Sequence, residues 1–172
     1  IGGSPEKTVE CISRMKASGQ KVSSITKKIN TLHYSEPLPS GYDSTAIVSF
    51  NREINILVVD DSEDVFEGIK TFLGDQDLIN LSWAGNSKDS FTMLEREHFD
   101  MIFLDHILND GTSIEFLKNI DKEDIDTPVI VVTGQGDEML ASQVIQLGAY
   151  EYLPKSRINT ESLSRVINNT LE

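Results

Sequence analysis

Three short apolar runs, each followed by a helix-like pattern, most constrain the fold of this 172-residue chain. INILVV (54–59), MIFL (101–104) and VIVV (129–132) have the composition of strands buried on both faces. Alternating strands and helices predict an α/β fold with a parallel sheet covered on both faces. Strands are predicted at 54–59, 78–84, 99–104, 128–133 and 149–153, and helices at 62–73, 87–97, 113–120, 138–147 and 160–171.

Polar side chains lie at or after the ends of four of these strands. Asp60 and Asp61 come after the first strand, Asp105 after the third and Thr133 at the end of the fourth, while Lys155 follows the fifth. Functional groups of a parallel sheet gather beyond the carboxyl ends of its strands, so these side chains are expected to share one pocket if the strands are neighbours. Three close carboxylates repel one another and favour a bound cation. Their hard oxygen ligands favour Mg²⁺, beside which a hydroxyl and an ammonium group suit a phosphoryl group.

The first 50 residues differ from the rest in charge and pattern. They carry six basic and four acidic side chains, whereas the other 122 carry nine basic and 24 acidic ones. An acidic main domain disfavours direct binding to nucleic acid. Residues 1–33 are predicted to form an amphipathic helix, 34–52 a linker and 53–172 the main domain. Apolar and small residues repeat along the helix with alternating spacings of four and three, at Cys11, Met15, Ser18, Val22, Ile25, Ile29 and Leu32.

Such a narrow stripe cannot be buried by the helix alone. We expect it to pair with a partner helix or with its own copy in a homodimer, and docking on the main domain is the alternative. No apolar run approaches the ~20 residues of a membrane span. The single cysteine, Cys11, excludes an internal disulfide framework and fits a cytoplasmic protein.

The motifs VVDDSED, FLDHILNDG, VVTGQGD and GAYEYLPK resemble the receiver domain of two-component response regulators. The resemblance covers residues 53–172 and implies a flavodoxin-like, doubly wound sheet of five parallel strands in the order 2-1-3-4-5. It also implies phosphorelay signalling, in which a histidine kinase or phosphotransfer protein is the partner. A dedicated enzymatic activity is not expected beyond Mg²⁺-dependent self-phosphorylation and autodephosphorylation.

The resemblance also implies a role for each site residue. Asp105 matches the aspartate that accepts the phosphoryl group. Asp60, Asp61 and Asp105, with the backbone carbonyl of Ile107, match the Mg²⁺ ligands. Thr133 and Lys155 match the groups that contact the phosphoryl oxygens. Tyr152 matches the aromatic switch residue, whose inward movement alters the face made by the fourth helix, fifth strand and fifth helix.

Some positions depart from the family pattern. Ser156 follows the lysine where proline is usual, and Pro154 precedes it, which leaves the loop after the last strand open. Asn109 replaces a proline, and Gly134 stands where alanine is common. Ile107 and Gln135 flank the path expected for hydrolytic water, so the lifetime of the phosphoryl group is open. Histidines and other acids are expected to be surface, packing, capping or turn residues: His33, His98, His106, Asp64 and Asp110.

The sequence also bears on other functional classes. The segment ISRMKASGQKVSSITKKINTL faintly resembles the second helix of a histidine-kinase dimerisation hairpin, but it has no His followed by an acid, so the chain is not expected to be a kinase. A haloacid-dehalogenase-like phosphatase needs a second aspartate two residues after its nucleophile, where Asp60 and Asp61 have Ser62 and Glu63. A receiver that is never phosphorylated and acts as a protein-binding module stays open.

Overall fold

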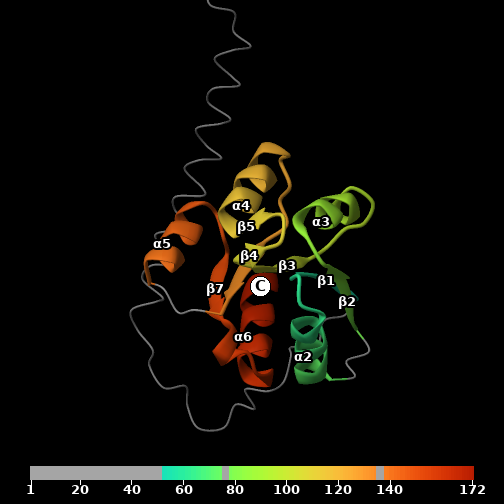
Figure 1. The fold of residues 1–172 in the computed structure, drawn as a ribbon. Coiled ribbons are helices and arrows are strands. Elements are labelled where there is room, and N and C mark those ends of the chain that lie inside the picture. The colour runs from blue at the N-terminus through green and yellow to red at the C-terminus, as the bar shows by residue number, and fades with distance from the viewer. Residues whose placement is uncertain (1–51, 75–77, 135–137) are drawn as a thin grey trace, which may run out of the picture. The chain divides into compact units, whose positions relative to one another are not determined.

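The structure, a computed structural model, describes residues 52–74, 78–134 and 138–172. The predicted helix over 1–33, the linker as far as residue 51 and Gln135 lie outside the described residues. Within the described ranges, five parallel strands form one sheet in the order β2-β1-β3-β6-β7, which confirms the predicted flavodoxin-like order (Figure 1). These strands are β1 (Ile54–Val59), β2 (Ile79–Ala84), β3 (Met101–Asp105), β6 (Val129–Thr133) and β7 (Glu151–Pro154).

Helices cover both faces of the sheet, as the apolar runs predict. On one face lie α2 (Glu63–Leu73) and α6 (Thr160–Leu171), and on the other α3 (Ser87–Leu94), α4 (Ser113–Lys122) and α5 (Glu138–Gln146) (Figure 1). Alternate residues of the strands divide between two buried clusters, one for each face. Because β1, β3 and β6 are buried on both faces, they hold the carboxyl edge of the sheet rigidly. Among the described helices, none combines the length and apolar character needed to cross a membrane.

Two short elements were not predicted. An antiparallel hairpin of β4 (Ile107–Leu108) and β5 (Gly111–Thr112) joins β3 to α4, and a 3₁₀ turn, η1 (Lys155–Arg157), follows β7. Both are too short to produce a periodic pattern in the sequence. The last strand begins at residue 151, two residues later than predicted, because the backbone N–H of Ala149 still bonds to the carbonyl of Val144 in α5.

Local hydrogen bonds explain where the helices begin. Thr112 and Glu115 form a reciprocal capping box at the start of α4, and Asn86 caps α3. Ser62 occupies the predicted N-cap position of α2, but its side chain makes no capping bond. Its backbone N–H instead donates to Oδ1 of Asp60 at 2.9 Å, so the sequence DDS orients a carboxylate at the end of β1.

Candidate functional site

The three central strands end at the same edge of the sheet, and each delivers a polar group there. Asp60 directly follows β1, Asp105 is the last residue of β3, and Thr133 is the last residue of β6. All three are buried, with 2%, 8% and 4% of their surfaces exposed. Strand pairing places Val59 beside Leu104 and Asp105 beside Val132, so the predicted neighbourhood of these groups follows directly from the strand order.

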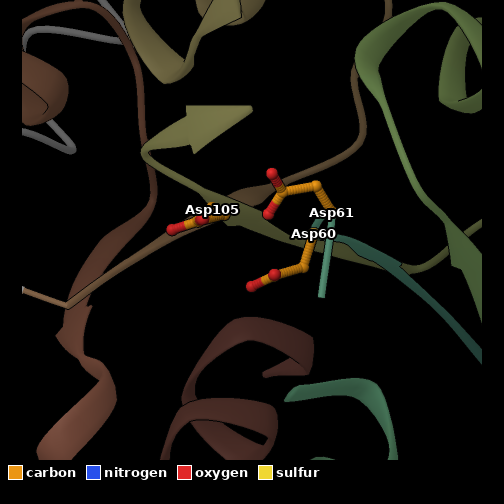
Figure 2. Close-up of side chains that lie close together, drawn as sticks. All are labelled: Asp60, Asp61 and Asp105. Carbon is orange, nitrogen blue, oxygen red and sulfur yellow. The ribbon is translucent and has the colours of Figure 1, made fainter. Parts of the chain in front are cut away.

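Three carboxylates converge at this edge. One carboxylate oxygen from each of Asp60, Asp61 and Asp105 lies within 4.8 Å of those of the other two. Figure 2 shows Asp60 and Asp61 approaching Asp105 from the end of β1. Asp61 is exposed and the other two are buried, so the cluster opens to solvent on one side.

Lys155 supplies a positive charge to the same cluster. Its Nζ lies 2.7 Å from Oδ2 of Asp60 and 3.2 Å from Oδ2 of Asp105. The residue begins η1 directly after β7, and Pro154 is the last residue of that strand. With Ser156 after the lysine and Pro154 before it, the loop still brings the ammonium group to the carboxylates.

Burial and charge act on the ionisation of the site in opposite directions. Burial, followed by the charge of Asp60, raises the pKa of Asp105, and these effects outweigh Lys155 and the backbone N–H of His106. Burial favours the neutral amine of Lys155, but the hydrogen bonds and charges of Asp60 and Asp105 prevail and raise the pKa of Lys155. The site therefore holds more negative charge than one ammonium group balances. Its all-oxygen donors and this excess charge fit a small divalent cation such as Mg²⁺.

The remaining predicted residues lie around this cluster. Tyr152 is in β7 opposite Val131, and its partly buried ring packs against the core beneath α4 and α5. Thr133 pairs with Pro154, the residue directly before Lys155. Ile107 begins β4 two residues after Asp105, and 67% of the residue's surface is exposed. The roles predicted for these residues stay predictions.

Three hydrogen-bonded contacts near the site were not predicted from the sequence. His106, expected to be a solvated loop residue, is half-buried, and its Nδ1 lies 2.9 Å from Oγ of Ser113. Asp110, expected to cap or turn, accepts from the backbone N–H groups of Ser87 and Lys88, both at 3.0 Å. The indole N–H of Trp83 donates to the backbone carbonyl of Asp60 at 2.8 Å. The contacts of Asp110 and Trp83 join residues 22 or 23 positions apart, and the contact between His106 and Ser113 spans the hairpin between β3 and α4. No local sequence pattern predicts such pairs.

The fold and the acidic edge define a signalling receiver domain, and sequence comparison gives the same class. The family model described as the response regulator receiver domain matches residues 56–168. The match covers more than half of the chain, so the chain belongs to the response regulator receiver domain family. Members of this family act in phosphorelay signalling with histidine kinases and generally bind Mg²⁺ at their acidic pocket.

Individual relatives agree with this assignment. The chain is 34% identical over 99 residues to the response regulator protein PilR of Pseudomonas aeruginosa, covering 58% of this chain and 22% of PilR. It is 29% identical over 111 residues to the transcriptional regulatory protein CpxR of Escherichia coli, covering 64% of this chain and 47% of CpxR. The chain thus spans less than half the length of either relative.

Solved receiver structures share the fold. A response regulator from Thermotoga maritima has a TM-score of 0.62 at 28% identity, covering 69% of this chain and 98% of that one. A response regulator receiver domain protein from Clostridium thermocellum has a TM-score of 0.61 at 29% identity, covering 69% and 94%.

Proposed function

We propose that Asp105 accepts a phosphoryl group from the phosphohistidine of a partner kinase or phosphotransfer protein. The observation that carries this proposal is the convergence of Asp60, Asp61 and Asp105 within 4.8 Å, with the ammonium group of Lys155 against two of them. A cluster of this composition attracts a cation and a phosphoryl group to the same place.

The transfer requires positioning and charge compensation more than acid–base chemistry. A carboxylate oxygen of Asp105 forms a bond to phosphorus while the phosphorus–nitrogen bond of the donor breaks, and the imidazole keeps that electron pair. Lys155 stabilises the negative charge of the phosphoryl oxygens. Asp60, Asp61, Asp105 and the carbonyl of Ile107 would hold Mg²⁺, which supplies further compensation of that charge.

The response follows from the neighbours of the phosphoryl group. Thr133, at the end of β6, would bind a phosphoryl oxygen through its hydroxyl. Its inward movement would leave space for the ring of Tyr152 and so change the face formed by α5, β7 and α6. Attack of water on phosphorus then releases inorganic phosphate, regenerates the carboxylate and resets the domain.

Acetyl phosphate with Mg²⁺ tests the proposal on the full chain. Wild type should gain the mass of one phosphoryl group, and Asp105→Asn should gain none. EDTA should prevent the gain in the wild type. An unmodified wild type would favour the alternative function, a receiver that acts as a protein-binding module without phosphorylation, because such a protein could retain every one of these residues.

A further inference from the structure

The β4–β5 hairpin is the chain segment that connects β3, the strand that ends at Asp105, to α4. It starts two residues after Asp105 and ends at Thr112, the N-cap of α4. The carbonyl of Ile107, proposed above as a metal ligand, lies in its first strand. The position of this hairpin therefore affects two ligands of the proposed phosphoryl site.

His106 fastens the base of the hairpin. Its backbone N–H donates to the carbonyl of Val132 in β6 at 2.9 Å and to Oδ1 of Asp105 at 2.8 Å. Its carbonyl accepts from the backbone N–H of Ser113 at 2.9 Å, and its Nδ1 lies 2.9 Å from Oγ of Ser113. Ser113 is fully buried at the start of α4, so its side of this contact is shielded from water.

Asp110 fastens the tip of the hairpin. Its two carboxylate oxygens accept from the first two backbone N–H groups of α3, those of Ser87 and Lys88. These donors have no partner inside the helix, and a negative charge at this end is favourable. The tip is thereby held to an element that precedes β3 in the chain.

The geometry points to His106, Ser113 and Asp110 as positioning residues for the phosphoryl site. They hold the hairpin at its base and tip, and through it they orient the carboxylate of Asp105 and the carbonyl of Ile107. This inference rests on the proposed function, because it concerns ligands assigned there. Groups that orient metal ligands typically contribute about 10–100-fold to metal affinity or activity. A small misplacement of reacting groups has effects of similar size.

Ser113→Ala tests the base of the hairpin. Removing Oγ leaves Nδ1 of His106 without that partner, and we expect Mg²⁺ affinity and the rate of phosphorylation by acetyl phosphate each to fall about tenfold. Calorimetric titration with Mg²⁺ and intact mass against time measure the two effects. The matched control is Ser164→Ala, since Ser164 is a fully buried helical serine whose Oγ has no hydrogen-bond partner among the residues that the structure describes. This control should behave as wild type.

Two substitutions of His106 separate positioning from packing. His106→Leu fills a similar volume but lacks the polar atom that contacts Ser113. Its Mg²⁺ affinity and phosphorylation rate should therefore equal those of Ser113→Ala. His106→Asn places a polar atom near the position of Nδ1, and it should restore Mg²⁺ affinity to within about twofold of wild type. Equal Mg²⁺ affinity and phosphorylation rate in wild type, Ser113→Ala and His106→Leu would overturn the inference, even if thermal unfolding shows a loss of stability.

Asp110→Ala tests the tip of the hairpin. Asp64→Ala, which removes an exposed acid from the first turn of α2, is the control. Asp110→Ala should weaken Mg²⁺ binding about tenfold, and Asp64→Ala should leave it unchanged. If both substitutions weaken Mg²⁺ binding equally, the cause is the loss of a negative charge in general. That result would contradict a positioning role for Asp110. A wild type that neither binds Mg²⁺ nor gains a phosphoryl group would instead overturn the proposed function itself.

Discussion

Asp105 lies where its negative charge is disfavoured, and its ionisation should therefore affect the stability of the fold. Burial and Asp60 raise its pKa in the folded protein, whereas the unfolded chain ionises it at the ordinary value. Between these two pKa values the folded state binds more protons, so stability falls as the pH rises through that window. Above the folded-state pKa, the ionised carboxylate destabilises the protein.

Asp105→Asn should remove this penalty. The amide keeps the shape of the side chain, and Lys155 retains its ion pair with Asp60 at 2.7 Å. At pH 7 without divalent cations, we expect the thermal midpoint of the variant to exceed that of wild type by about 3 °C. The difference should shrink as the pH falls below the folded-state pKa of Asp105.

Mg²⁺ should make wild type more stable than Asp105→Asn. At about 100 times its dissociation constant, a ligand of the folded state adds about 2.7 kcal/mol to stability. Wild type should gain this amount, and the variant, which lacks one carboxylate ligand, should gain less. A variant less stable than wild type at pH 7 without Mg²⁺ would contradict the assigned direction of the pKa of Asp105.

Trp83 is the single tryptophan of the chain and should report on the site. Its indole N–H bonds to the carbonyl of Asp60, so a cation drawn to the carboxylate of Asp60 should change the emission of Trp83. Titration with Mg²⁺ should give a saturable change in fluorescence. Asp61→Asn should shift the titration to Mg²⁺ concentrations at least about tenfold higher. Mg²⁺ binding that is detected by calorimetry without any change in Trp83 emission would contradict this prediction.

At the scale of elements, the opposite edge of the sheet is stabilised by a buried aspartate. Oδ1 of Asp100 accepts from Nη1 of Arg52 at 2.6 Å, and Oδ2 accepts from the backbone N–H of Asn55 at 2.8 Å. This carboxylate ties the start of β1 to the residue before β3. It lies at the opposite ends of the strands from the proposed phosphoryl site, so its contribution is expected to be purely structural.

Asp100→Ala should destabilise the domain by about 1–3 kcal/mol, because the backbone N–H of Asn55 loses its side-chain partner. Urea unfolding followed by circular dichroism measures the loss. Asp126→Ala, at a nearby exposed aspartate, is the control and should change stability by less than about 0.5 kcal/mol. Phosphorylation of Asp100→Ala by acetyl phosphate under folding conditions should be as fast as in wild type, and a slower rate would argue against a purely structural role.

Elements with continuous apolar runs were predictable from the sequence. The short hairpin, which is held in place by a few hydrogen bonds to other elements, was not. Ile54–Val59 was located at its observed bounds because burial on both faces leaves a continuous apolar signal. The convergence of Asp60 and Asp105 followed from the strand order that the family resemblance implied. The β4–β5 hairpin, with two residues in each strand, carries no periodicity. The contacts of His106 and Asp110 depend on tertiary geometry, and the sequence around them is compatible with plain loop residues.

At the scale of the whole molecule, we predict that the segment before the receiver domain mediates self-association. We propose that residues 1–33 form a helix that pairs with its own copy. Ile25→Glu with Ile29→Glu places charges in the stripe and should convert a dimer to a monomer in sedimentation velocity of the full chain. Lys27→Glu, outside the stripe, is the control and should stay dimeric. A wild type that sediments as a monomer would contradict the proposal.

The position of Lys155 has a consequence for how a newly made chain acquires its function. The carboxylates of Asp60, Asp61 and Asp105 belong to the first half of the domain, whereas Lys155 follows the last strand. A chain still being synthesised thus contains the three aspartates before the lysine whose ammonium group partly balances their charge. Only after β7 has joined β6 does the cluster gain this partner. Competence to signal is therefore expected to appear late, when the sheet is complete, and partly folded chains should be poor phosphoacceptors.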